Sequence, residues 1–239
     1  MKLVAPIYKQ PLYSTTMNNI VNFISLLGIN NNREWFNENK DLYQAAKDQF
    51  DDIFQQLIFK IGKFDSRILN ATPKEGVFRI YRDVRFSHDK RPYKQQFSGF
   101  ISYPLGWKSK YAGYYIHVDA EGAHFSAGIW RPEPDVLKAL RNSVVDNYDE
   151  LKEIRSGKEF NKTFGDNFYE EDKLKKMPVG FPKDFAEPEL LKLKHYMINH
   201  ELGDVMDMSQ ENFIKEMANL AKIAYPFIRF LNDTVGETI

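Results

Sequence analysis

The side chains best suited to chemistry lie close together in one segment, Arg79–Lys94. Six of them are Arg or Lys and two are Asp, although the whole chain has 33 basic and 33 acidic residues and no net formal charge. Cations gathered this densely repel one another unless they face carboxylates or an anionic ligand. The segment is therefore the first place to look for a binding site.

The planar guanidinium group of arginine suits the recognition of anions. It binds phosphate or carboxylate groups through two parallel hydrogen bonds, and a loop beside a rigid strand commonly holds such groups. We therefore predict a site at which the protein binds or processes a phosphorylated or other anionic ligand. The side chains assigned to this site are Arg79, Arg82, Arg85, Lys90, Tyr93 and Lys94.

A structural role for the same cations is the main alternative. They would then form internal ion pairs that organise the fold of a structural or interaction protein, with no small ligand. Candidate partners in the sequence are Glu34, Glu38, Asp119 and Glu121.

Histidine side chains offer acid–base chemistry, because imidazole titrates near neutral pH. In a strand over residues 114–119, alternation would place His117 and Asp119 on one face. His88 lies in the basic segment, where Asp83 is close in sequence. A metal-independent enzyme that uses one of these histidines with one of these aspartates is thus a second hypothesis for function.

Metal binding is the less favoured use of the histidines. His117, His124 and Asp119 could form a metal site, but a hydrogen-bonded histidine is the more common outcome. His195 and His200 lie five residues apart on an expected helix, a spacing that does not align two ligands. We expect neither a metal nor another cofactor.

Aromatic residues are abundant, with 19 Phe, 13 Tyr and 3 Trp, and could stack on bases or sugars. Trp35 follows a helical period and is predicted to lie in the core, whereas Trp107 is predicted to be the most exposed Trp. No glycine-rich nucleotide-binding motif occurs, and neither does a serine-hydrolase or zinc-peptidase motif. Nucleic-acid binding is possible in principle but is not favoured, since the chain has no net positive charge.

The length of 239 residues is enough for a substantial core. The absence of cysteine excludes disulfides, thiolate catalysis and Cys-ligated zinc. The N-terminal residues lack the apolar core of a signal peptide, and no stretch approaches 18 apolar residues. We therefore expect a cytoplasmic protein that does not associate with membranes.

Helical periodicity appears on both sides of a central region. A helix is predicted over about residues 16–27, and a second from Asn32 to Ile61, where Asn31 and Glu34 have the spacing of a capping box. Residues 136–151 form another amphipathic face. A helix is predicted over residues 187–199, and a last one begins near Ser209 and is kinked or restarted at Pro226.

The central region has the period of β-strands. Strands are predicted over residues 77–82, 97–103, 114–119 and 123–130, with a hairpin turn at residues 120–122. Short connections between sequential strands favour antiparallel pairing. We predict one α+β domain over residues 1–239, in which an antiparallel sheet is flanked by N-terminal and C-terminal helices.

Several long blocks of the sequence resemble those of a known family. They are residues 31–40, 78–94, 113–117, 128–132 and 174–181, with 191–194 as a last element. The chain is similar to the uncharacterised bacterial and fungal family catalogued as domain of unknown function 2461. The resemblance extends over residues 16–235 and leaves residues 1–14 as an N-terminal extension. It implies a one-domain cytoplasmic protein, but no reaction and no ligand.

Overall fold

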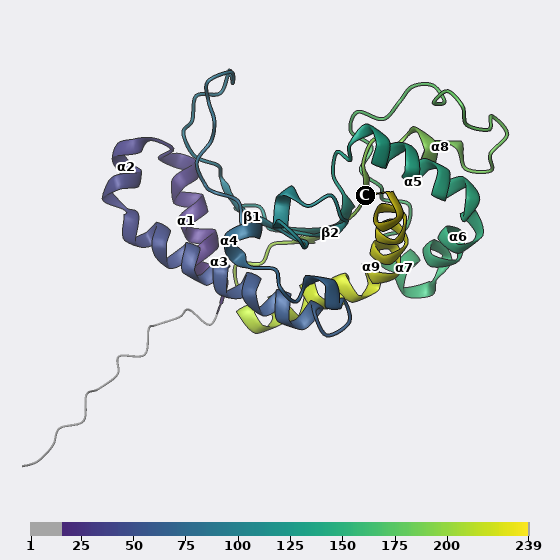
Figure 1. Ribbon diagram of the computed structural model, residues 1–239. Coiled ribbons are helices and arrows are strands. Elements are labelled where there is room, and N and C mark those ends of the chain that lie inside the picture. Colours follow the sequence, from purple (N-terminus) through teal and green to yellow (C-terminus); the bar gives the residue numbers. More distant parts are fainter. Residues whose placement is uncertain (1–15, 239) are drawn as a thin grey trace, which may run out of the picture.

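A four-stranded antiparallel sheet lies at the centre of the molecule, between two groups of helices (Figure 1). The structure is a computed structural model that describes residues 16–238, so the N-terminal extension predicted over residues 1–14 lies outside the described residues. The strand order follows the chain, and the predicted α+β class with an antiparallel sheet is confirmed. The strands are β1 (Gln96–Ile101), β2 (Gly113–Asp119), β3 (Ala123–Ile129) and β4 (Tyr196–Gly203).

The helices cover one face of the sheet and both of its ends. In Figure 1, α3 and α9 lie beneath the sheet, α1 and α2 lie at one end, and α5–α8 lie at the other. The longer helices are α1 (Asn18–Ile29), α3 (Lys40–Ile61), α5 (Pro134–Asp146), α6 (Tyr148–Ser156) and α9 (Gln210–Thr238). The short ones are α2 (Arg33–Glu38), α4 (Pro73–Gly76), α7 (Lys158–Thr163) and α8 (Pro188–Lys192).

Alternation along β2 divides its side chains between the two faces. Tyr114, Ile116 and Val118 are buried in the core that the sheet shares with the helices. The hydroxyl group of Tyr114 donates to the buried carboxylate of Asp65 at 2.9 Å, which satisfies a polar group inside this core. The intervening residues of β2 therefore point to the opposite face, which the helices leave open.

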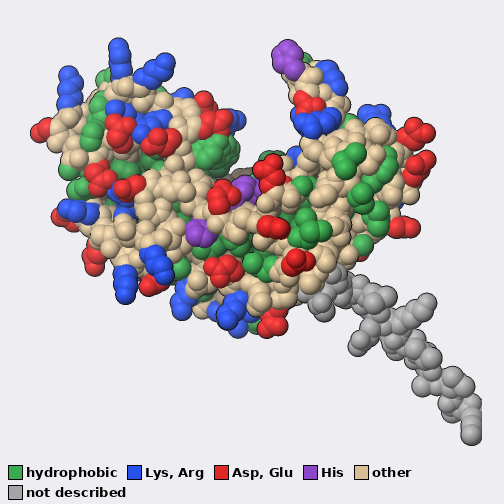
Figure 2. All heavy atoms as spheres, turned by 180° about the vertical axis from the view of Figure 1, so that it is seen from behind, with side chains coloured by type: hydrophobic (Ala, Val, Ile, Leu, Met, Phe, Trp, Pro, Cys, Tyr) green, Lys and Arg blue, Asp and Glu red, His purple; other side chains and the backbone are tan. Residues whose placement is uncertain are grey.

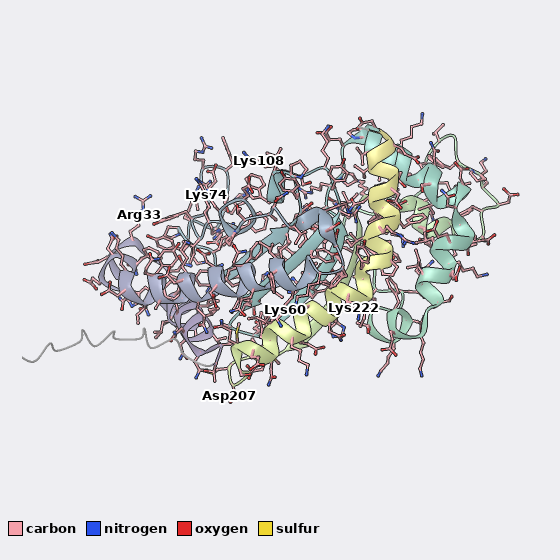
Figure 3. The ribbon with its side chains drawn as sticks, turned by 60° about the horizontal axis from the view of Figure 1, so that its bottom comes forward. Arg33, Lys60, Lys74, Lys108, Asp207 and Lys222 are labelled. Atoms are coloured by element: carbon pink, nitrogen blue, oxygen red, sulfur yellow. The ribbon has the colours of Figure 1, made fainter. Side chains whose placement is uncertain are left out.

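Helix α9 connects the two ends of the molecule. It runs beside α3, bends in its middle and continues beside α5 (Figure 3). Pro226 lies inside it, and a proline ring removes one helical hydrogen bond and crowds the preceding turn, so the predicted kink occurs within one continuous helix. None of the described helices is long and apolar enough to cross a membrane.

The predicted helix from Asn32 to Ile61 is in fact two helices. Asn39 leaves the helical conformation, with φ −114° and ψ 29°, and separates α2 from α3. The cap is Asn32 rather than Asn31, and its side chain accepts a hydrogen bond from the backbone N–H of Trp35 at 2.9 Å. The break changes which side chains face inward: Phe36 is buried, whereas Trp35 is only half-buried.

Two other predicted elements were wrong. Residues 77–82 form no strand and make only isolated bridges, from Val77 to Gly99 and from Tyr81 to Tyr93. The helix predicted over residues 187–199 ends as the short α8, after which the chain becomes extended and forms β4 at the sheet edge. His200 therefore lies on a strand and His195 directly before it, rather than on a helix.

Candidate functional site

A cavity of about 480 Å³ lies on the open face of the sheet. Figure 2 shows the hollow between the two ends of the molecule, with histidine side chains beside it. All four strands contribute to its floor, and loops from both ends form its walls. The floor residues are Gln96, Ser98, Phe100, Tyr115, His117, His124, Ser126, Met197 and Asn199. The wall residues are Phe78, Lys94, Trp107, Ser109, Tyr111, Ile129, Trp130 and Tyr169.

The register of the sheet places polar side chains in rows across the floor. Ser98 pairs with His117, which pairs with His124 on the next strand. In the neighbouring row, Tyr115 pairs with Ser126, whose hydroxyl donates to the amide oxygen of Asn199 at 2.7 Å. Because the strands are antiparallel and in register, four separate parts of the chain present hydrogen-bonding groups to one small space.

Three side chains of β2 form a hydrogen-bonded line along the strand, and the first two of them belong to the cavity floor. The hydroxyl group of Tyr115 lies 3.0 Å from Nδ1 of His117, and Nε2 of His117 lies 3.0 Å from Oδ2 of Asp119. His117 and Asp119, which strand alternation placed on one face, are thus in direct contact. Tyr115 had no place in the sequence-based site, although it shares their face by simple alternation.

The turn after β2 holds the carboxylate of Asp119 in place. Its Oδ1 accepts hydrogen bonds from the backbone N–H groups of Glu121 and Gly122, at 2.8 and 3.0 Å. Burial favours the neutral acid, but the backbone hydrogen bonds and the contact with His117 outweigh it and lower the pKa of Asp119. The carboxylate is therefore ionised at neutral pH.

His124 lies flat against His117. Their ring centroids are 4.2 Å apart and the rings are inclined by 21°. Burial, followed by repulsion from His117, lowers the pKa of His124 from 6.5 to about 4. His124 is consequently neutral at physiological pH, and it covers His117 without adding a second positive charge.

Lys94 supplies the positive charge in the cavity wall. Its Nζ lies 5.3 Å from the centre of the Phe78 ring, and the side chain is half-buried. Burial, and then the charge of Arg79, lower the pKa of Lys94. Within residues 16–238 no carboxylate forms an ion pair with it, and the lining residues include neither Asp nor Glu.

Aromatic rings face each other across the cavity. Trp107, as predicted, is the most exposed Trp, at 51%, and packs beside Phe78. On the other side Trp130 stacks on the buried His195, with centroids 4.2 Å apart, and makes an edge contact with Tyr169. Nδ1 of His195 accepts a hydrogen bond from the backbone N–H of Arg131, which fixes the ring behind Trp130.

Most of the basic segment projects from the molecule as an arm, which we define as residues 81–93 (Figure 1). Arg82 is bound to Asp89 at 2.6 Å, and Arg85 is bound to Asp83 at 2.6 Å. Arg91 is also bound to Asp89. These guanidinium groups thus contact carboxylates of the arm itself, and not the four partners that the sequence suggested.

The other residues of the predicted site have different surroundings. Tyr93 is buried at the base of the arm, where its ring stacks on Phe36 with centroids 4.0 Å apart. The ammonium group of Lys90 donates to the carbonyl oxygen of Val84 at 3.1 Å. His88 and Arg79 are exposed, and Asp83 contacts Arg85 rather than His88. Of the residues predicted to bind an anionic ligand, Lys94 is the one that lines the cavity.

The histidines do not assemble a metal centre within the described residues. No group of three His, Cys, Asp or Glu side chains in that part of the chain is arranged to hold a metal ion. Nδ1 of His200 is instead 3.0 Å from the carbonyl oxygen of Thr163.

These features define the protein as an α+β domain with a cavity on the open face of an antiparallel sheet. Over residues 19–230 the chain matches a family described as "Conserved hypothetical protein (DUF2461)". The chain belongs to this family, which confirms the resemblance of the sequence blocks. No curated protein and no solved structure matches the chain.

Proposed function

We propose that the protein binds a small ligand in the sheet cavity, and that the ligand combines a ring with an anionic group, either phosphate or carboxylate. The volume of about 480 Å³ suits a molecule of this size. Aromatic walls provide faces for a ring, and the polar floor provides hydrogen bonds that orient it.

The position of Lys94 is the observation that carries the proposal. The half-buried ammonium group of Lys94 has no carboxylate partner, and the ring of Phe78 replaces only part of its lost hydration. Burial, and then the charge of Arg79, lower its pKa. An anionic ligand would provide the missing partner and return the pKa of Lys94 toward its ordinary value. Arg79, which is close enough to affect Lys94 electrostatically, adds positive charge at the same wall.

The arginines of the arm contribute less to this site. Each of Arg82, Arg85 and Arg91 already has a carboxylate at hydrogen-bonding distance. A ligand would have to displace that carboxylate to gain the same hydrogen bonds, so its net gain would be small. We therefore assign ligand binding to Lys94. The arginines instead stabilise the conformation of the arm through their ion pairs.

A thermal-shift and calorimetry screen tests the proposal. The probes are inorganic phosphate, adenosine monophosphate, glucose 6-phosphate and 4-hydroxybenzoate, each of which raises the melting temperature if it binds the folded protein. For a probe that binds, Lys94→Met should weaken affinity by about tenfold or more, because a charge-assisted hydrogen bond contributes about 1.5–3 kcal/mol.

Lys222→Met is the matched control. Lys222 is exposed on α9, in the helical layer that covers the other face of the sheet (Figure 3). This variant removes the same charge and should leave affinity unchanged. Equal affinities for the Lys94→Met and wild-type proteins, or no binding of any probe, would contradict the proposal.

A further inference from the structure

In the line of Tyr115, His117 and Asp119, the donor and the acceptor of each hydrogen bond can be assigned. Asp119 is ionised and can only accept hydrogen bonds, so Nε2 of His117 must carry a proton and donate it to Oδ2. In neutral His117 the other ring nitrogen, Nδ1, then has a lone pair and can only accept. The hydroxyl group of Tyr115 therefore donates to Nδ1.

The lone pairs of the Tyr115 oxygen face the side chains of Ser98 and Gln96, which can donate to it, and a ligand in the cavity would take the place of one of these donors. Tyr115 lines the cavity together with His117, and its cross-strand neighbour Ser126 donates its own proton to Asn199. A hydroxyl group of a bound ligand can thus donate to the Tyr115 oxygen. The three groups are suited to carry a proton away from the ligand, along the strand.

His117 has a carboxylate as its nearest charged neighbour. Asp119 contacts it from its own strand, and the stacked ring on β3 belongs to His124, which is neutral at physiological pH. From β1 the opposed residue is the uncharged Ser98. Lys94 is the remaining charged group among the lining residues, and it would be neutralised by the anionic group of the ligand.

We propose that Tyr115 transfers a proton between the cavity and His117, with Asp119 as the positioning residue, and that the substrate class is a small anion that carries an ionisable hydroxyl group. The inference rests on the proposed ligand site. It goes beyond binding, because it assigns general acid–base chemistry to a tyrosine in that site.

The proposed step conserves every proton and involves no oxidation. The O–H bond of the ligand breaks as its proton moves to the Tyr115 oxygen, while the original Tyr115 proton moves to Nδ1 of His117. The products are an oxyanion of the ligand, a neutral Tyr115 and an imidazolium group paired with the Asp119 carboxylate. Because burial raises the pKa of Tyr115, a free tyrosinate is unfavourable, and the concerted transfer avoids it.

A chromogenic probe can report the transfer. The probe 4-hydroxy-3-nitrobenzoate has a carboxylate for Lys94, a ring for the aromatic walls and a phenol whose ionised form absorbs visible light. If the relay operates, the phenol of the bound probe should titrate about one pH unit or more below that of the free probe. Binding itself is measured separately by calorimetry.

Two variants separate proton transfer from binding. Tyr115→Phe keeps the ring and removes the hydroxyl group, so the probe should still bind but should titrate as it does in water. Asp119→Asn removes the charge that stabilises the imidazolium group and should raise the titration midpoint of the bound probe by about one pH unit. Melting temperatures show whether each variant is folded.

The outcomes distinguish the two proposals. Binding of the probe without a shift in its titration would overturn the relay and leave the ligand site intact, whereas failure of the probe to bind would count against both. A measurement on the unaltered protein adds a check that needs no variant. Nitrogen-15 NMR of the neutral His117 ring should show the proton on Nε2 and not on Nδ1, and the reverse tautomer would also overturn the relay.

Discussion

At the scale of single residues, the basic segment contains the same local unit twice. Asp83 accepts hydrogen bonds from the backbone N–H and the guanidinium group of Arg85, and Asp89 does the same for Arg91. Each aspartate thus closes a small ring with the arginine two residues later. The spacing Asp-x-Arg occurs twice in the basic segment and a third time at Asp65 and Arg67, which also form an ion pair. It is the signal that predicts local ion pairs rather than long-range ones.

These hydrogen-bonded Asp–Arg pairs predict how the carboxylate of Asp83 titrates. Hydrogen bonds from the side chain and backbone of Arg85 lower the pKa of Asp83 from 3.8 to about 2. Because the pKa is depressed in the folded state, the pairing stabilises the arm above about pH 4 and is lost as the pH falls through about 2.

Carbon-13 NMR of the Asp83 carboxyl group measures this midpoint directly. The group is exposed, so added salt should move the midpoint back toward its ordinary value. Arg85→Gln provides the control and should restore ordinary titration. A midpoint near 4 in the unaltered protein would show that the ring does not persist in solution.

At the scale of elements, the base of the arm is held more firmly than its tip. The side chain of Asn31 accepts from the backbone N–H of Tyr93 and donates to its carbonyl oxygen, both at 3.1 Å. Tyr93 itself is 4% exposed, whereas Phe86, further out on the arm, is 94% exposed. The two aromatic residues of one short segment should therefore differ widely in their effect on stability.

Substitution of these two residues tests the difference. Tyr93→Ala should lower the free energy of unfolding by about 3–5 kcal/mol, since it removes a buried ring that stacks on Phe36. Phe86→Ala should change it by less than about 0.5 kcal/mol. Urea denaturation of both variants gives the comparison, and equal effects would mean that the arm is not anchored through Tyr93.

The secondary-structure predictions were wrong where the local sequence pattern and the long-range strand pairing disagree. Residues 196–198 are a short apolar run that periodicity alone cannot assign to helix or strand, and its pairing with β3 decided the outcome. The predicted strand over residues 77–82 touches the sheet only through an isolated bridge. Strands β1 to β3 were predicted correctly, and the short turn over residues 120–122 joins β2 directly to β3.

The cavity shows the same limit of sequence-based reasoning. Alternation alone identified the shared face of His117 and Asp119, and the basic segment pointed to Lys94. The opposite wall comes from Trp130 and Tyr169, far along the chain, and Asn199 lies on the strand that was predicted as a helix. A site assembled from distant segments depends on the order of the strands, which no local pattern specifies.

At the scale of the whole molecule, α9 joins the helices at both ends of the sheet. Its buried Asn232 accepts a hydrogen bond from the backbone N–H of Ala112 at 2.7 Å and donates to the carbonyl oxygen of the same residue at 3.2 Å. This amide therefore ties the second half of α9 to the residue that precedes β2.

Removal of the Asn232 amide should destabilise the entire fold. Asn232→Ala leaves the buried backbone N–H of Ala112 without a partner and its carbonyl oxygen with only the longer hydrogen bond from Ser102, and should lower the free energy of unfolding by about 2–3 kcal/mol. Asn212→Ala, at an exposed position near the start of the same helix, should change it by less than about 0.5 kcal/mol. Circular dichroism during denaturation measures both, and similar values for the two variants would contradict a bridging role for Asn232.

The late position of α9 in the chain has a consequence for biosynthesis. Its apolar side, which includes Phe213, Met217 and Phe227, covers parts of α3, α5 and β3 that are translated earlier. While α9 is still inside the ribosome, those earlier surfaces have nothing to cover them and are available to chaperones or to other nascent chains. Folding of this protein during translation therefore awaits the emergence of α9. If translation stops before Ser209, the nascent chain lacks α9 and its apolar core remains exposed.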